Sequence, residues 1–250
     1  MSPKLPAGWQ WVPLSRLVSK IEAGKSFKCD ERPPIGAEHG IVKVSAVTWG
    51  TYDEGESKTI TDAGKINEAY LIQPGDFLFS RANTLQLVGA CVLVQQTQKR
   101  LLLSDKILRL VMPDELKPWV LWFLRSGEGR RQIEALSTGN QESMRNIGQE
   151  RIGQIEVPLP AEPTMQRIVS RIEELFSEID EGERALERAM KLVKHYRQSV
   201  LKAAFSGQLV PQDPADEPAS ALLARLAGEA SEGQNATQRR GRRARTTATP

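Results

Sequence analysis

Residues 165–205, MQRIVSRIEELFSEIDEGERALERAMKLVKHYRQSVLKAAF, place apolar residues at every seventh position. A repeat of 3.5 residues, maintained over about six heptads, is typical of a helix whose apolar seam packs against another helix. The residues expected at this seam are Ile168, Ile172, Leu175, Ile179, Leu186, Val193, Tyr196 and Val200. The stretch therefore predicts a long helical spacer that needs a partner helix.

The charges of this stretch are segregated along its length. Residues 173–187 are rich in Glu and Asp, with Arg184 as their only base, whereas residues 188–202 carry bases and no acids. In a parallel pair of such helices like charges face each other, whereas an antiparallel pair places the acidic block on the basic one. The layout favours an antiparallel partner with a similar charge distribution.

The whole chain reads as an α+β protein in four parts. We expect one mixed α/β domain at residues 1–160, the spacer at 161–207, a short C-terminal helical segment at 208–227 and a disordered basic tail at 228–250. Gly207 is suited to end the long helix, because glycine readily adopts the left-handed C-cap conformation. The tail is small, polar and rich in arginine, so it cannot bury a core.

Alternating polarity and turn signals divide the first domain into short elements. Strands are expected at residues 9–12, 40–47, 76–80, 87–94, 106–112 and 155–159. A short helix capped by Ser15 is expected to carry Leu17, Val18 and Ile21. Further helices are expected at residues 118–126, 129–136 and 143–151.

The composition fits a soluble globular protein. The chain has 250 residues, of which 40% are hydrophobic and 26% charged, and its net charge of +3 is compatible with nucleic-acid binding. Its two cysteines, Cys29 and Cys91, have neither the spacing of a zinc site nor enough partners for a disulfide framework. The first 20 residues lack a secretory signal and no apolar run approaches a membrane span, so we expect a cytoplasmic protein.

No constellation of residues points to catalysis. Gly24-Lys25-Ser26 imitates the end of a phosphate-binding loop, but residue 19 is serine where that pattern requires glycine. His39 and His195 have no Cys or His neighbour at metal-ligand spacing. We therefore expect neither an enzyme nor a metal protein.

Polar residues instead gather at expected strand ends and in loops. Basic, amide and hydroxyl side chains are the groups that contact phosphates and base edges in DNA. The candidate DNA-binding residues are Lys25, Ser26, Lys43, Ser45, Thr48, Arg81, Asn83, Thr84, Asn140, Gln141, Arg145 and Asn146. Each one alone is ordinary turn chemistry, and only the set makes DNA contact plausible.

Over residues 5–227 the chain resembles the specificity subunit of type I restriction-modification systems. In the helical part the resemblance rests on QRIV at 166–169, IEELF at 172–176 and SVLKAAFSG at 199–207. In the first domain it rests on LPAGW at 5–9, GKS at 24–26, PGD at 74–76, SRANT at 80–84, VG at 88–89 and SDK at 104–106. Each motif is weak alone, and their order makes the set specific.

This resemblance implies a target-recognition domain that reads one half of a split DNA site, and a helical spacer that docks on the methyltransferase subunits. It implies double-stranded DNA, the methyltransferase subunit and the restriction subunit as partners. In that family S-adenosylmethionine and ATP are used by the other subunits, so no cofactor is expected for this chain.

One departure from the family pattern concerns the number of domains. Members commonly carry two recognition domains and two spacers, packed antiparallel, whereas this chain has one of each. It is then a half-length subunit that dimerises, a half that works beside a separately encoded half, or a remnant. The antiparallel charge layout favours the first, and a homodimer would read a palindromic, interrupted site. The alternative outside this family is a coiled-coil adaptor that does not bind DNA.

Overall fold

The computed structural model describes residues 4–48, 50–141 and 144–228 of the chain. Two compact units are distinguished, Met1–Glu178, called here the head, and Ile179–Pro250. Mixed sheets and helices in the head are followed by a long helix, which confirms the α+β fold class. The expected tail at 228–250 lies almost wholly outside the described residues.

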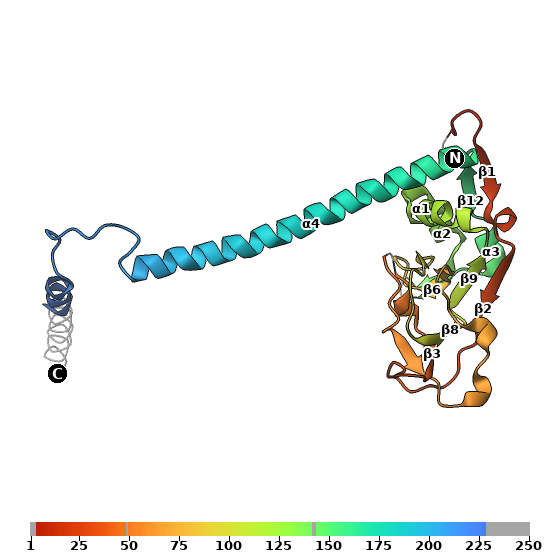
Figure 1. Ribbon diagram of the computed structural model, residues 1–250, viewed down its shortest axis with the longest axis horizontal. Helices are drawn as coiled ribbons and strands as arrows, with labels where there is room; N and C mark the ends of the chain where they lie inside the picture. The colour runs from red at the N-terminus through yellow and green to blue at the C-terminus, as the bar shows by residue number, and fades with distance from the viewer. Residues whose placement is uncertain (1–3, 49, 142–143, 229–250) are drawn as a thin grey trace, which may run out of the picture. The chain divides into compact units, whose positions relative to one another are not determined.

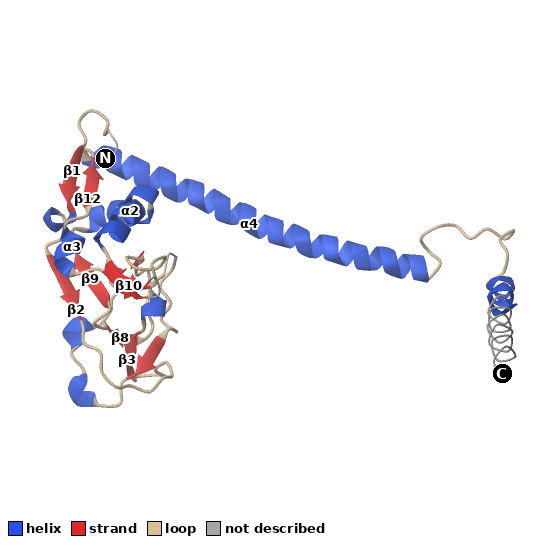
Figure 2. Cartoon of the chain, turned by 180° about the vertical axis from the view of Figure 1, so that it is seen from behind, coloured by secondary structure: helices blue, strands red, loops and turns tan. Residues whose placement is uncertain are grey.

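The centre of the head is a four-stranded antiparallel sheet in the order β2-β9-β5-β7. Its strands are β2 (Lys20–Ala23), β9 (Ile107–Val111), β5 (Phe77–Ser80) and β7 (Cys91–Leu93). Three smaller sheets complete the head: β1 (Gln10–Pro13) with β12 (Glu156–Leu159); β4 (Ser57–Thr59), β3 (His39–Val42) and β8 (Arg100–Leu102); and β10 (Thr138–Gln141), β11 (Met144–Asn146) and β6 (Ala82–Asn83). Its helices are α1 (Lys117–Arg125), α2 (Gly127–Leu136) and α3 (Gln149–Gly153). Figures 1 and 2 both place the β1–β12 pair at one end of the head and β3 with β8 at the other.

The central sheet is buried on both faces. In β5, Phe77 and Phe79 belong to one hydrophobic cluster and Leu78 to another. Successive residues of a strand point to opposite faces, so the two clusters lie on the two sides of the sheet. This explains why β5, β7 and β9 read as nearly continuous apolar runs, because neither face alternates with solvent.

An internal ion-pair network holds three elements of the head together. The guanidinium of Arg109 in β9 lies 2.7 Å from Glu22 of β2 and 2.8 Å from Asp76, which precedes β5. All three side chains are at least four-fifths buried. Arg109 also donates to the backbone carbonyl of Leu71. The Asp76 carboxylate in turn accepts from the amide of Gln73, so this charged cluster is largely satisfied.

The long helix α4 (Glu162–Phe205, 44 residues) begins as part of the head core. Met165 is buried in the first cluster, and Ile168 and Val169 pack against it. Further along, the ring of Phe176 stacks on Trp122 of α1 with centroids 5.0 Å apart and an interplanar angle of 12°. The first turns of α4 are therefore fixed by apolar contacts to the head.

In the second unit α4 continues to Phe205, and the full helix is roughly 66 Å long at 1.5 Å per residue. Gly207, with a φ of 71°, ends it as the sequence predicts, and the amide of Gln208 donates to the carbonyl of Ala203. Residues 219–228 are helical. Among the described residues, no helix combines the length and apolarity needed to cross a membrane.

Several expected elements are shorter than predicted or of another kind. The helix expected after Ser15 is a single 3₁₀ turn (Leu14–Arg16), and Ile21 lies in β2 instead. The strands expected at 40–47 and 87–94 are confined to His39–Val42 and Cys91–Leu93. The helix expected at 143–151 starts only at Gln149, because Met144–Asn146 pair with β6 and β10. Strand pairing, which local sequence does not specify, places Ile21 and residues 144–146 in strands, whereas residues 44–46 form a 3₁₀ turn that ends the strand before them.

Replacing Arg109 by Met should destabilise the head, because the aliphatic stem is kept while Glu22 and Asp76 lose their buried counter-ion. Breaking one side of a buried ion pair costs about 3–5 kcal/mol. The control is Arg100→Met, which removes an exposed pair with Glu68 and should cost less than about 1 kcal/mol. Urea unfolding of the two variants checks this, and equal losses of stability would contradict it.

Candidate nucleic-acid interface

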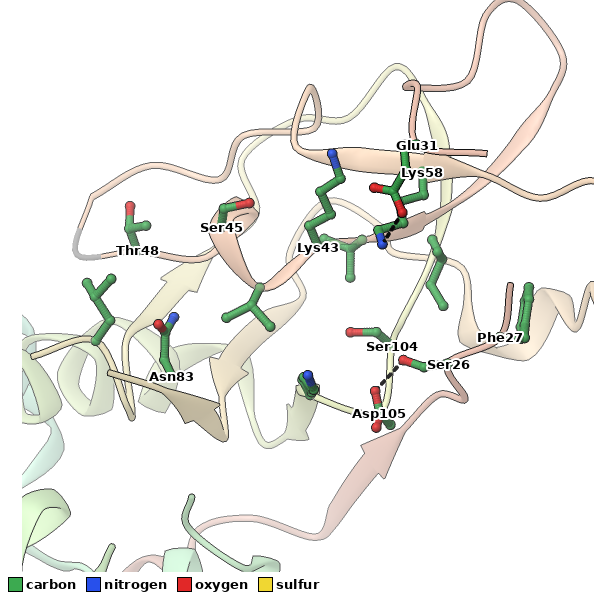
Figure 3. Close-up of a pocket in the computed structure, with 15 residues that line it drawn as sticks. Ser26, Phe27, Glu31, Lys43, Ser45, Thr48, Lys58, Asn83, Ser104 and Asp105 are labelled. Atoms are coloured by element: carbon green, nitrogen blue, oxygen red, sulfur yellow. Dashed lines mark hydrogen bonds and ion pairs between the residues drawn. The ribbon is translucent and has the colours of Figure 1, made fainter. Parts of the chain in front are cut away.

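A cleft of about 780 Å³ lies in the head and brings together five of the expected DNA-binding residues. Those residues are Ser26, Lys43, Ser45, Thr48 and Asn83. They come from segments far apart in sequence: the loop after β2, the end of β3 with the 3₁₀ turn that follows, and β6. Figure 3 shows Lys43, Ser45 and Thr48 along one wall, with Asn83 on another.

The charges in this cleft are partly paired. The ammonium of Lys58 lies 2.7 Å from Glu31 and holds the pKa of that carboxyl below its usual range. Lys43 and Lys106 also line the cleft, and neither makes an ion pair with a described residue. Two ammonium groups are thus left for an anionic ligand such as a DNA phosphate.

Close backbone contact positions the floor of the cleft. Gly24 donates its amide to the carbonyl of Ser104, and a Cβ at Gly24 would lie 1.8 Å from the carbonyl oxygen of Leu103. Only glycine allows this approach without a backbone shift. Two residues later the hydroxyl of Ser26 donates to the carboxylate of Asp105 (Figure 3). Gly24 and Ser26 of the GKS sequence therefore hold the loop at residues 103–105, which is consistent with its incomplete match to a phosphate-binding loop.

A second group of expected residues lies on the sheet of β10, β11 and β6. Arg145 is paired with Asn83, and Asn146 with Ala82, in the register of β11 and β6. The Nε of Arg81 donates to the side-chain oxygen of Asn146 at 3.4 Å. Because Asn83 also lines the cleft, this sheet borders the cleft at β6.

Arg145 is used extensively within the chain. Its guanidinium donates to the hydroxyl and carbonyl of Ser137 and to the carbonyl of Gly139. These bonds hold the β10–β11 hairpin in place. Gln141 is exposed in that hairpin, whereas the side chain of Asn140 lies outside the described features. The backbone amide of Thr84 donates a hydrogen bond to the side-chain oxygen Oδ1 of Asn83, at 2.9 Å.

Lys25 lies apart from the main cleft, in a smaller hollow of about 310 Å³. Phe27 borders both hollows, and Lys65 lies over its ring with the ammonium 5.4 Å from the centroid. The described part of the chain therefore places Lys25 beside the cleft that holds Ser26, in a neighbouring hollow.

Sequence reasoning missed several residues of the cleft. They are Phe27, Glu31, Lys58, Ser104, Asp105 and Lys106. Ser104, Asp105 and Lys106 did form one of the motifs behind the family resemblance, and that was the available signal. Nothing local in the sequence indicates that this turn lies against residues 24–26.

The expected seam residues divide into two groups. Ile168 packs against the head core and Ile172 is half-buried. Leu175, Ile179, Leu186, Val193 and Tyr196 are all at least 40% exposed within this chain, and Val200 is half-buried. An exposed apolar row of this kind is what a helix awaiting a partner presents.

Neither cysteine is part of a metal site among the described residues, where no cluster of three or more His, Cys, Asp or Glu side chains is placed to bind one. Cys91 is fully buried, as its apolar surroundings predict, and burial raises the pKa of its thiol to about 12.

The chain is similar to curated specificity subunits. It is 30% identical over 206 residues to the Type I restriction enzyme EcoEI specificity subunit of Escherichia coli, covering 81% of this chain and 35% of that protein. It is 28% identical over 236 residues to the EcoKI specificity subunit of E. coli K12, covering 90% and 50%. No profile of a known protein family matches the chain. The chain spans about a third to a half of the length of the curated relatives it matches.

Two solved structures share the fold. The crystal structure of the HsdS subunit from Thermoanaerobacter tengcongensis aligns with a TM-score of 0.51 at 20% identity, covering 83% of this chain and 47% of that one. A chain from a study of complex assembly and conformational transition of the type I R-M system aligns with a TM-score of 0.54 at 19% identity, covering 83% and 48%. The curated relatives confirm the resemblance to type I specificity subunits, over about a third to a half of such a subunit, and the solved structures show the same fold.

Replacing Gly24 by Ala should disturb the floor of the cleft. The new Cβ would clash with the backbone of Leu103, and overpacking of this kind costs about 1–3 kcal/mol. The matched control is Gly127→Ala, where a Cβ meets nothing within 4 Å and stability should change by less than about 0.5 kcal/mol. Urea unfolding compares them, and an unchanged midpoint for Gly24→Ala would refute the close approach.

Proposed function

We propose that this chain is the sequence-specific DNA-recognition subunit of a type I restriction-modification complex. Its head reads one half of a split DNA site, and α4 docks on the methyltransferase subunit and, through the assembly, on the restriction subunit. The similarity to specificity subunits over 81–90% of the chain carries this proposal. The cleft supports it independently, because Lys43 and Lys106 line it without an ion pair to a described residue.

The chemistry of the cleft suits this role. Asn83, Ser45 and Thr48 offer amide and hydroxyl groups that can bond to base edges in the major groove. Lys43 and Lys106 offer unpaired ammonium groups for phosphates, which fix the position of a protein on the duplex. A cleft with both kinds of group can combine sequence reading with affinity.

The second half-site is read by a second copy of this chain in the same proposal. A second copy would bury the exposed apolar row on α4. When two copies run antiparallel, the acidic block of each helix faces the basic block of the other. A two-fold pair of identical heads would read a palindromic site with a spacer set by the helices. The chain itself catalyses no reaction, and it acts in the cytoplasm, where its DNA is reached.

Selection from randomised duplex DNA with the full-length chain tests the recognition function. We expect one preferred sequence and an affinity that falls steeply with salt. Asn83→Ala should relax the preference at one base position by about 1–3 kcal/mol, because a base contact carries sequence information. Lys43→Gln should weaken binding to all sequences alike, whereas Lys4→Gln, outside the cleft, should change nothing. Equal binding to every DNA sequence would sink the proposal.

Charge reversal tests the antiparallel pair. Changing Arg188, Lys191, Lys194 and Arg197 to Glu should weaken the dimer, because acidic blocks would then face each other. Reversing Glu174, Glu178, Glu181 and Glu183 to Lys in the same chain should restore it. In a parallel pair, blocks of equal charge face each other already in the wild-type chain. The four changes to Glu would then have little effect on the dimer. Sedimentation equilibrium reads the dimer constant, and a monomer at all concentrations would refute self-association.

A further inference from the structure

We propose that Asp105 is a specificity-determining residue whose carboxylate accepts a hydrogen bond from the N4 amino group of a cytosine, next to the hydroxyls of Ser26 and Ser104. The proposal rests on the DNA-recognition function proposed above. It concerns the floor of the main cleft, where these three side chains meet (Figure 3).

A carboxylate is an unfavourable group in a cleft that receives DNA, because it repels phosphates. Among the described residues that line the cleft, the acids are Glu31 and Asp105. Glu31 is neutralised by Lys58 at 2.7 Å. Asp105 is exposed and has no ion pair with a described residue, so its negative charge is not compensated in this way. Such a charge is tolerated beside DNA when it faces hydrogen-bond donors, and these lie on base edges.

Asp105 also keeps acceptor capacity for a ligand. An ionised carboxylate has two oxygens with about four acceptor positions. Ser26 donates to one oxygen, Oδ1, and thereby fixes the orientation of the group. The fold uses no other hydrogen bond to this side chain among the described residues. The remaining positions are available to a donor in the cleft.

Ser104 provides a second, independent sign of a ligand at this place. Its side chain is 95% buried, and its hydroxyl oxygen has no hydrogen-bond partner in the described structure. Buried polar groups are nearly always paired, so an unpaired one that lines a cleft indicates a ligand group that completes it. In Figure 3 the Ser104 hydroxyl lies in the same region as the Ser26–Asp105 hydrogen bond.

The chemistry of base edges selects cytosine. In the major groove only the amino groups of cytosine and adenine are donors. Adenine carries its N7 acceptor next to the amino group, and a carboxylate would be repelled by it, whereas cytosine has no neighbouring acceptor there. Lys106, which follows Asp105 and lines the same cleft, suits the O6 and N7 acceptors of the paired guanine. The two residues together match a C·G base pair.

The test is a double-mutant cycle, in which the Asp105 carboxylate and the N4 amino group of cytosine are removed separately and together. The preferred site is first selected with the full-length chain, and each cytosine is then replaced in turn by 2-pyrimidinone, which lacks the amino group. At one cytosine, the wild-type chain should lose about 5- to 150-fold in affinity. Asp105→Ala, which removes both acceptor oxygens, should lose less than about twofold at that position and keep its normal response at all others.

Two further variants keep the result interpretable. Glu115→Gln removes an exposed carboxylate that lies outside the cleft and should behave as wild type in the cycle. Ser26→Ala should reduce the response at the same cytosine without abolishing it, because the carboxylate remains but is less firmly held. Circular dichroism and urea unfolding confirm that each variant folds, and Asp105→Leu replaces Asp105→Ala if the latter does not.

The outcomes separate this inference from the proposed function. A selected site in which Asp105→Ala responds to every 2-pyrimidinone as wild type does would overturn the role of Asp105 and leave DNA recognition intact. So would a selected site without cytosine, or a folded Asp105→Ala that loses preference equally at all positions. A wild-type chain that selects no sequence would instead refute the proposed function.

Discussion

The central sheet of the head has apolar side chains on both faces, and each face has to be covered by a different part of the chain. Phe77 and Phe79 lie in the hydrophobic cluster on one face, and Leu78 lies in the cluster on the other face. The first face is covered by the helices and by the start of α4, where Met165 is buried. The second face is covered by the segments around β3 and β8, including Val42 and Leu101. The helix attachment and the cleft-bearing part of the head thus depend on a single two-sided sheet.

Local patterns predicted the parts of this fold whose stability is local. The seven-residue repeat predicts both ends of α4 to within two residues, and Gly207 lies where the helix stops. The apolar runs of β5 and β9 were recognised as strands. By contrast β2, β4, β8 and the β10–β11 hairpin are short polar or mixed stretches that become strands only because a neighbour pairs with them.

The same division applies to the candidate site. Residue type alone identified Lys43, Ser45 and Asn83, and the fold brings them into one cleft. Residue type does not predict Asp105 and Ser104 as site residues, because their position depends on the contact of Gly24 with the Leu103 backbone, some eighty residues further along the chain. A carboxylate is also a poor candidate for a DNA-binding residue until its surroundings are known. Its partners, and not its type, give it a plausible role.

The stacking of Phe176 on Trp122 has a consequence for how such proteins can exchange parts. The head does not end where its last strand ends, since it includes the opening turns of the helix through Glu178. A recombination joint at residue 160 would separate Met165, Ile168 and Phe176 from the head residues that they contact, and loss of the buried Met165 would leave a hole in the core. A joint beyond residue 178 would transfer the head together with the helical turns that pack against it. A head transferred to another chain is therefore complete only when it carries the helix through residue 178.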